Sequence, residues 1–520
     1  MSDLAIARRG RLDDTGAVPV PLIEPLDEHN RVLLENVRPT SHVNPTPSGR
    51  YNLVIIGAGP AGLVTAAGAA GLGARVALVE KHFMGGDCSN VGCVPSKALL
   101  RAARAAQAVR TACEFGVRVP AGVTVDFPAV MERMRRVRAG ISHVDSVARF
   151  RSLGVDVYLG EGRFAGCNVV EVDGRRLEFA RAVITTGARA ARLPVPGLDA
   201  VDYLTNENVF WLTERPRHLI VIGAGPIGCE LGQAFRRFGA DVTIVTEHVL
   251  PREDADAAAI VEASLRRDGV RVERGATISG VTQQGREKTV TYVVDGETRR
   301  VAGDALLLGA GRAPNIEGLG LEQAGVAHGP RGVTVDDGLR TTNPHIFAAG
   351  DVCSRFQFTH AADALARIVI QNALFFGRKK ASALHIPWCT YTDPELAHVG
   401  LSLRDAAAAG IEATSVTVEL ANVDRAILDG ETEGFARAVV RKGSDRLVGM
   451  TIVAGHAGEM IGEAVLALSR GVGLGSFAAT IHPYPTQAEV LRKLGDAYNR
   501  TRLTPRVKRL FERLLAWRRM

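Results

Sequence analysis

Residues 53–62, LVIIGAGPAG, decide the fold of this chain. A short apolar run of β-forming residues leads into three spaced glycines, Gly57, Gly59 and Gly62, followed by small helix-forming residues. The first glycine allows a tight turn, the second lets the backbone approach a pyrophosphate, and the third lets helix and strand pack closely. A second strand, RVALVE, ends at Glu80, which is placed to accept hydrogen bonds from a ribose diol. This register predicts a dinucleotide-binding fold.

The same unit recurs downstream as HLIVIGAGPIGCELGQAFRRFGADVTIVT, so we expect two dinucleotide folds. Its three glycines are Gly223, Gly225 and Gly228. The position equivalent to the ribose acid is Thr246, and Glu247 follows it. No arginine cluster stands there to bind a 2′-phosphate, which favours NADH, although NADPH stays open. Glu247 is either a displaced ribose ligand or an ordinary solvated loop residue.

The bulk composition is that of a globular protein of several domains. The chain has 520 residues, 46% hydrophobic and 23% charged. Residues 53–74 carry no charge over a length that could span a bilayer, but their glycine pattern favours strand, turn and helix. Seven scattered cysteines and a start without an apolar signal core point to the cytoplasm. Because residues 498–520 hold eight Arg or Lys and one Glu, they account for the net charge of +7, and the near-neutral body does not suggest nucleic-acid binding.

The segment GGDCSNVGCVPSK, residues 85–97, follows the first glycine unit and its second strand. It places Cys88 and Cys93 with four residues between them. The two cysteines could form a structural pair, a metal clip or a working dithiol. No second Cys/His pair at ligand spacing lies nearby, which disfavours the metal clip. A structural disulfide would be unusual in a reducing compartment.

Four further segments complete a recognisable pattern. They are TTGAR (185–189), LGAGRAPN (308–315), TTNPHIFAAGDV (341–352) and IPWCTYTDPELAHVG (386–400). With the two glycine motifs and the cysteine pair, the chain resembles the pyridine nucleotide–disulfide oxidoreductases from about residue 51 to 495, and most of all their mercuric reductase branch.

The resemblance implies an α/β fold with two Rossmann-like domains, for FAD and NAD(P), and an α/β dimerisation domain, in a homodimer. The expected division is an N-terminal extension (1–50), the FAD domain (51–205), the NAD(P) domain (206–330), a return segment (331–384), the dimerisation domain (385–495) and a basic tail (496–520).

The resemblance also implies the chemistry. Electrons would pass from NADH or NADPH through FAD to a Cys88–Cys93 disulfide, with Cys88 as the outer interchange thiol and Cys93 beside the flavin. Lys97 would form an ion pair with Glu230 near the flavin. The run VPSKALLRAARAA looks helical, and its positive end would lower the pKa of the thiols. The implied FAD-binding residues are Gly57, Gly59, Gly62, Glu80, Lys97, Gly187 and Asp351, and those for NAD(P) are Gly223, Gly225, Gly228, Glu247 and Gly311.

The segment IHPYPTQAEV departs from the family pattern. Disulfide-reducing members carry a histidine there that acts as acid and base in the partner subunit, oriented by a glutamate five residues later. Here Tyr484 takes the histidine position, Glu489 is the acid, and His482 lies two residues earlier and should point elsewhere. A tyrosine with an ordinary pKa of about 10 is a poor proton acceptor at neutral pH.

The electron acceptor is therefore open. Mercuric reductases resemble the chain in having a tyrosine there, yet they carry a vicinal cysteine pair near the C-terminus, whereas the last cysteine here is Cys389. A disulfide or a soft metal ion such as Hg(II) is the expected acceptor, and no resident metal site is expected. A flavin-binding protein without turnover is disfavoured by the intact cysteines, Lys97 and Glu230. The other five cysteines are expected to be buried structural thiols: Cys113, Cys167, Cys229, Cys353 and Cys389.

Both ends of the chain contain a candidate helix. DEHNRVLLENV, in the N-terminal extension, is expected to form a short helix packed on the FAD domain. PRVKRLFERLLAWRR is amphipathic with a basic face, and its apolar residues are Val507, Leu510, Phe511, Leu514 and Leu515. The preferred interpretation is docking on the protein's own surface. The alternative is peripheral contact with anionic lipid at the inner face of a membrane, in a flavoprotein that supplies electrons to a quinone or membrane partner.

Overall fold

The structure is a computed structural model that describes residues 21–520. The first twenty residues of the expected N-terminal extension lie outside this range. The chain divides into two compact units, which are described separately. Unit 1 holds the described part of Met1–His248 and Gly269–Leu384, and unit 2 holds Val249–Asp268 and His385–Met520.

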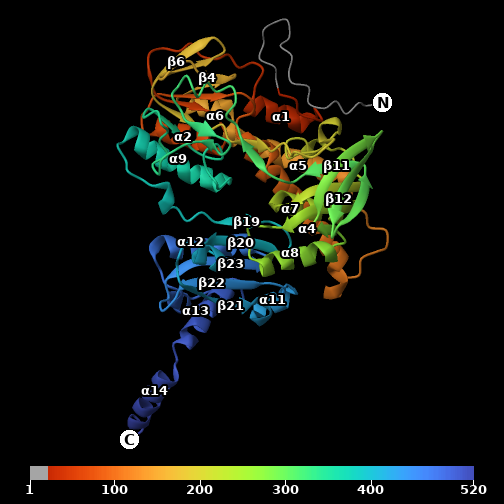
Figure 1. The fold of residues 1–520 in the computed structure, drawn as a ribbon, viewed down its shortest axis with the longest axis vertical. Coiled ribbons are helices and arrows are strands. Elements are labelled where there is room, and N and C mark those ends of the chain that lie inside the picture. The colour runs from red at the N-terminus through yellow and green to blue at the C-terminus, as the bar shows by residue number, and fades with distance from the viewer. Residues whose placement is uncertain (1–20) are drawn as a thin grey trace. The chain divides into compact units, whose positions relative to one another are not determined.

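A seven-stranded sheet organises the first dinucleotide fold of unit 1, in the order β3-β2-β1-β6-β5-β4 with β18 also pairing with β6. Figure 1 labels β4 and β6 of this sheet, together with the helices α2, α6 and α9. The strands are β1 (Tyr51–Ile56), β2 (Val76–Glu80), β3 (Val155–Leu159), β4 (Gly162–Phe164), β5 (Val169–Val172), β6 (Arg175–Ile184) and β18 (Ile346–Ala348). The helices are α1 (Glu28–Val37), α2 (Pro60–Gly71), α3 (Gly86–Val91), α4 (Cys93–Thr111), α5 (Phe127–Ser142), α6 (Val147–Ser152) and α9 (Thr359–Leu374).

The uncharged run of residues 53–74 forms β1, a glycine turn and α2, as the sequence predicts. Gly57 has a φ of +104°, a conformation that side chains rarely adopt. A Cβ on Gly62 would collide with the carbonyl oxygen of Gly57, so the third glycine is required by the close contact of helix and turn. None of the helices between residues 21 and 520 has the length and apolar character that crossing a bilayer requires.

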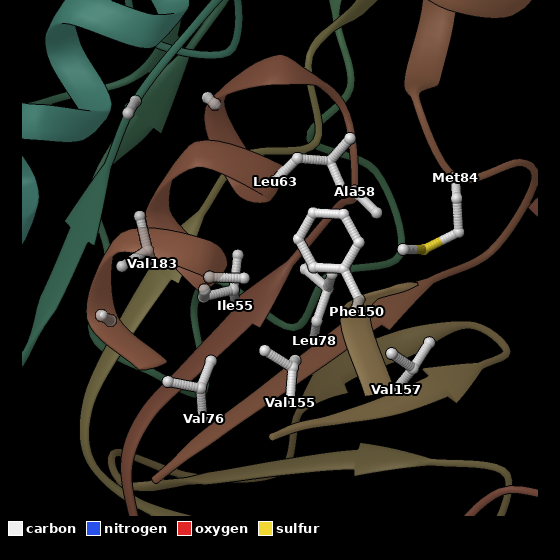
Figure 2. Packing of buried hydrophobic residues seen from close by; sticks show 14 of the residues in the cluster. Ile55, Ala58, Leu63, Val76, Leu78, Met84, Phe150, Val155, Val157 and Val183 are labelled. Atoms are coloured by element: carbon white, nitrogen blue, oxygen red, sulfur yellow. The ribbon is translucent and has the colours of Figure 1, made fainter. Parts of the chain in front are cut away.

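One face of this sheet is covered by helices that share an apolar core. Figure 2 shows Ile55, Leu78 and Val157 of the strands packed against Leu63 of α2 and Phe150 of α6. The same cluster also takes in residues of α1 and α9, so the predicted N-terminal helix is part of this core. Residues 53–56 of β1 and 76–79 of β2 are apolar and buried, as expected for parallel strands that are covered on both faces.

The second dinucleotide fold has a four-stranded sheet in the order β10-β9-β8-β14. Between β10 and β14, the chain forms a separate antiparallel sheet in the order β11-β12-β13. The elements are β8 (His218–Ala224), α7 (Pro226–Arg237), β9 (Asp241–Val249), β10 (Arg271–Arg274), β11 (Thr277–Gln284), β12 (Glu287–Val294), β13 (Glu297–Gly303) and β14 (Ala305–Leu308). Two short antiparallel pairs complete unit 1: β7 (Ala188–Ala190) with β15 (Arg312–Pro314), and β16 (His328–Gly329) with β17 (Gly332–Val333).

Unit 2 is built on a five-stranded antiparallel sheet in the order β19-β20-β23-β22-β21. Its elements are α8 (Ala255–Arg267), β19 (Trp388–Thr390), β20 (Glu395–Gly400), α10 (Leu403–Ala408), β21 (Ala413–Glu419), α11 (Asp424–Asp429), β22 (Phe435–Arg441), β23 (Leu447–Ala454), α12 (Ala457–Arg470), α13 (Glu489–Thr501) and α14 (Pro505–Trp517).

The placement of α8 in unit 2 differs from the sequence-based division, which puts this helix inside the NAD(P) domain. Polar contacts explain the difference. The Trp388 indole donates to Glu253 at 2.6 Å, and the Arg437 guanidinium pairs with Asp254 at 3.4 Å. Such links join residues far apart in sequence, so the spacing of motifs does not reveal them.

Candidate functional site

The two motif cysteines lie at the junction of α3 and α4 in unit 1. Cys88 is on α3, while Cys93 is the first residue of α4, where the helix dipole favours a thiolate. Both are free thiols in the structure. Donation by the Cys88 thiol lowers the pKa of Cys93 to about 6, and Thr359 and Lys97 act in the same direction. The same hydrogen bond, together with burial, raises the pKa of Cys88.

Thr359, at the start of α9, is a site residue that the sequence does not reveal. Its hydroxyl lies 3.5 Å from Cys93 Sγ, although the two residues are 266 positions apart. A hydroxyl at this distance supports a thiolate by donating to sulfur.

Lys97 and Glu230 are brought together, as the resemblance implies. Lys97 Nζ lies 2.8 Å from Glu230 Oε2, which joins α4 of the first dinucleotide fold to α7 of the second. The Glu230 side chain is buried and the Lys97 side chain is partly exposed. The lysine charge therefore lies near Cys93 and is held there by a buried acid.

The first nucleotide site has Glu80 at the end of β2. Its carboxylate accepts from the backbone N–H groups of Ala58 and His82, both at 2.6 Å, and burial raises its pKa. A Cβ on Gly59 would meet only the Cα of Gly86, at 3.9 Å. The chain's own packing therefore does not demand a glycine there, and the open space fits the approach of a pyrophosphate.

Asp351 and Arg312 lie next to each other in unit 1. Asp351 follows β18, and its Oδ2 lies 3.5 Å from Arg312 Nη2. Burial raises the pKa of Asp351 to about 6, an effect that the guanidinium opposes. Arg312 also donates to Asp87 at 2.7 Å and to the Ala188 carbonyl at 2.8 Å. Asp87 and Arg312 are site residues that the sequence motifs do not single out, and they link the residue before Cys88 to the Asp351 carboxylate.

Gly187 and Gly311, both expected near a cofactor, lie on either side of the β7–β15 pair. Gly187 has a φ of +69° and Gly311 a φ of +78°, and the carbonyl of Gly187 accepts from Asn315 N at 2.9 Å. The positive φ values explain why glycine is present at these turns.

The second nucleotide site repeats the first with a threonine in the acid's place. Gly223, Gly225 and Gly228 form the β8–α7 turn. Ala224 N donates to Thr246 Oγ1 at 3.2 Å, as Ala58 N does to Glu80 in the first fold. Glu247 is exposed and lies 3.6 Å from His248 Nε2. Thr246 therefore takes the place against the glycine turn that Glu80 has in the first fold, and Glu247 lies at the surface.

The C-terminal motif lies on unit 2. Tyr484 is 70% exposed, and its hydroxyl donates to Asp424 at 2.9 Å, which raises the tyrosine pKa. Glu489 begins α13, and its Oε1 forms an ion pair with Arg492, while its buried Oε2 has no hydrogen-bond partner in the described structure. His482 bonds Glu463 at 3.0 Å and points elsewhere, as expected. The acid that contacts the tyrosine is therefore Asp424, not Glu489.

The expectation that the other five cysteines are buried is wrong for two of them. Cys113 and Cys167 are exposed because they lie in loop or 3₁₀ segments at the surface. Cys229 is buried on α7, and the remaining two, Cys353 and Cys389, are partly buried.

Comparison with protein families gives two matches. Residues 51–366 match the family model described as pyridine nucleotide-disulphide oxidoreductase, and residues 386–494 match the dimerisation domain of the same family.

Individual relatives fall into more than one group. A mercuric reductase from Bacillus cereus is 35% identical over 445 residues, covering 85% of this chain and 70% of the relative. A dihydrolipoyl dehydrogenase from Geobacillus stearothermophilus is 34% identical over 454 residues, covering 85% and 95%. Among solved structures, the Cu(II) complex of the HOCl-induced flavoprotein disulfide reductase RclA from Escherichia coli matches with a TM-score of 0.75 and 28% identity, covering 85% of this chain and 98% of that one.

Proposed function

Because the chain belongs to the pyridine nucleotide-disulphide oxidoreductase family, we propose that it oxidises NAD(P)H and reduces a thiol-reactive acceptor through Cys88 and Cys93. Its cofactors are FAD and NAD(P)H, and its dimerisation domain supports a homodimer. The observation that carries the proposal is the environment of Cys93: the Cys88 thiol, Thr359 and Lys97 lower its pKa to about 6, and the residue begins helix α4.

The residues of the chain divide the work. FAD, when bound, supplies two-electron chemistry between the nicotinamide and the dithiol. When the Cys88–Cys93 disulfide takes up two electrons and one proton, the S–S bond breaks and leaves a thiolate on Cys93 and a thiol on Cys88, in line with the directions of their pKa shifts. The Lys97–Glu230 pair holds a positive charge beside that thiolate. Glu80, Asp351 and the open space at Gly59 would hold FAD.

Cys88 must lose its proton before it can attack an acceptor. In our proposal, Tyr484 of the partner subunit lies beside the acceptor when this attack takes place. Its hydroxyl already donates to Asp424, so its oxygen is available to accept a hydrogen bond or to contact a bound ion. This arrangement differs from a histidine base and favours acceptors that need little proton transfer. A soft metal ion fits this description, and some relatives are named mercuric reductases. Disulfides remain the second acceptor class, since other relatives are named dihydrolipoyl dehydrogenases.

The deciding experiment is an anaerobic titration of the holoenzyme with NADH and with NADPH, followed by absorbance. Wild type should develop a long-wavelength thiolate-to-flavin band, and Cys93→Ser should lack it. Cys88→Ser should show the band without needing reduction, because its Cys93 cannot form the disulfide. Reduction of wild type without any such band would contradict the proposal. Once the band is established, Hg(II), Cu(II) and small disulfides can be compared as acceptors in the same cuvette.

A second candidate function is delivery of electrons at a membrane surface through α14. No residue of α14 is buried, so the expectation that this helix docks on the protein's own surface is wrong for the chain that the structure describes. Its apolar side chains stay exposed: Leu510, Phe511, Leu514, Leu515 and Trp517. With Arg and Lys residues around them, they form the pattern of an interfacial helix on anionic lipid.

Vesicle sedimentation tests this second candidate. Full-length protein should sediment with phosphatidylserine-containing vesicles at low salt and be released at high salt, whereas a variant lacking residues 500–520 should stay in the supernatant. If the full-length protein also stays in the supernatant at low salt, the membrane candidate fails and the dithiol proposal is unaffected.

A further inference from the structure

A buried arginine connects the N-terminal extension to the helix that carries Cys88. Arg138 of α5 is only 1% exposed. Its Nη1 donates to the Asn90 carbonyl on α3 at 2.7 Å, and its Nη2 donates to Asn30 Oδ1 on α1, also at 2.7 Å. Asn30 and Asn90 are buried as well. A buried guanidinium needs acceptors for its N–H groups, and Arg138 finds one acceptor on α1 and one on α3.

Both partners of Arg138 are held firmly. The Asn30 amide also donates to the Pro25 carbonyl at 2.8 Å, which fixes its oxygen toward the arginine. The Asn90 amide donates to the carbonyls of Met84 at 3.0 Å and Gly86 at 2.8 Å. Asn90 therefore closes the turn from which α3 starts, two residues after Cys88. The hydrogen-bond chain Asn30–Arg138–Asn90 fixes this turn from the N-terminal side.

A second set of contacts reaches the same turn from the end of α1. Met84 N donates to the Val37 carbonyl at 3.1 Å. Arg38 Nη1 donates to the carbonyls of Lys81 at 3.0 Å and His82 at 2.7 Å. Lys81, His82 and Met84 lie between Glu80 and α3. The N-terminal extension therefore contacts the connection between β2 and the helix that carries Cys88.

We infer that the N-terminal helix α1, which precedes the part of the chain that matches the family, positions the dithiol through the chain Asn30–Arg138–Asn90. This inference rests on the proposed function only in treating Cys88 and Cys93 as the working pair. Asn30, Arg138 and Asn90 are positioning residues, since none of them touches either sulfur. Their effect is to fix the direction in which α3 presents Cys88, and small misplacements of a reacting group are costly.

Three holoenzyme variants test the inference. Asn30→Ala removes the acceptor for Arg138, and Asn30→Asp keeps an acceptor oxygen in its place. Asn36→Ala is the matched control, because Asn36 is on the same helix and also bonds α5, at Ser142 Oγ, without any link to α3. The readout is the rate of iodoacetamide labelling of Cys88 after thiol reduction, measured by mass spectrometry relative to the exposed Cys113 of the same molecule. The thiolate-to-flavin absorbance and the thermal unfolding midpoint are recorded in parallel.

We expect Asn30→Ala to change the Cys88 labelling ratio by about threefold or more and to weaken the absorbance band, because the turn before α3 loosens. Asn36→Ala should stay close to wild type in both readouts, and Asn30→Asp, which keeps the acceptor oxygen but loses the amide donor to the Pro25 carbonyl, should fall between Asn30→Ala and wild type. An unchanged labelling ratio in Asn30→Ala would overturn the inference, as would an equal change in Asn36→Ala, which would indicate general destabilisation. If wild type itself lacks the absorbance band, the proposed function fails, while the labelling ratios still decide whether α1 positions Cys88.

Discussion

Lys97 Nζ lies 2.8 Å from Glu230 Oε2, so the lysine on the dithiol helix is held by a buried acid of the other dinucleotide fold. The pair sets two opposite charges near Cys93. The lysine lowers the pKa of that thiol and the glutamate raises it, while the hydrogen bond from Cys88 is the largest influence.

The first prediction follows from these opposite signs. Lys97→Met should raise the pKa of Cys93, so the thiolate band of the reduced enzyme should titrate about 1 to 2 pH units higher than in wild type. Glu230→Gln leaves the lysine charge without its neutralising partner and should move the midpoint downward. Absorbance at a series of pH values in the anaerobic two-electron-reduced enzyme measures both. Shifts in the same direction for the two variants would contradict the charge argument.

The second prediction concerns Tyr484. Tyr484→Phe removes the hydroxyl that donates to Asp424. Turnover with the acceptor should fall by about 10- to 100-fold, because the hydroxyl that we propose contacts the acceptor is lost. Stopped-flow reduction by NAD(P)H should stay at the wild-type rate, since that half of the reaction does not use Tyr484. Glu489→Gln is the matched control, because this acid is paired with Arg492 instead. If Glu489→Gln alone slows acceptor turnover, the assignment of Asp424 as the tyrosine's partner is wrong.

The third prediction concerns the first nucleotide site. Glu80→Gln would turn an amide N–H toward one of two backbone N–H groups, at Ala58 or His82, that now donate to the carboxylate. FAD binding should weaken by about 1–3 kcal/mol, or about 5- to 150-fold in Kd. Fluorescence titration of the apoprotein with FAD measures this. Glu171→Gln, which alters only the surface ion pair with Arg163, should leave the Kd unchanged.

The fourth prediction separates the two interpretations of Glu247. Because Thr246 takes the inner position and Glu247 is exposed, Glu247→Ala should raise the KM for NADH by no more than about twofold if the residue is only solvated. A hydrogen bond to the ribose would give about tenfold or more. Steady-state KM values for NADH and NADPH in both proteins distinguish the two interpretations. A preference for NADPH in wild type would contradict the expectation of NADH, which rests on the lack of an arginine cluster to bind a 2′-phosphate.

The sequence predicts the local features of this molecule well. Both strand–turn–helix units are found where their glycines place them, because the conformation of Gly57 and the contact of Gly62 with the turn are set within a few residues. The helix following Cys93 and the pairing of Lys97 with Glu230 also agree with expectation, the latter because the resemblance supplies a long-range partner that no spacing reveals.

The features that the sequence does not reveal depend on tertiary contacts. Thr359 reaches Cys93 across 266 positions, and Arg312 reaches Asp87 across 225. The replacement of Glu489 by Asp424 as the tyrosine's partner depends on how α11 packs, which the PTQAE motif does not report. Exposure of Cys113 is similarly decided by where a surface 3₁₀ turn happens to lie.

The exposure of Tyr484 has a consequence for genetics. If each acceptor site takes its cysteines from one subunit and its tyrosine from the other, two defective alleles can restore each other. Mixed dimers of Cys88→Ser and Tyr484→Phe chains contain one site with both residues intact, although each parent dimer has none. Refolding the two impaired proteins together should therefore raise activity above that of either parent, to about one quarter of the wild-type sites when the subunits assort at random. Recovery would establish that the unit of catalysis is the pair of chains.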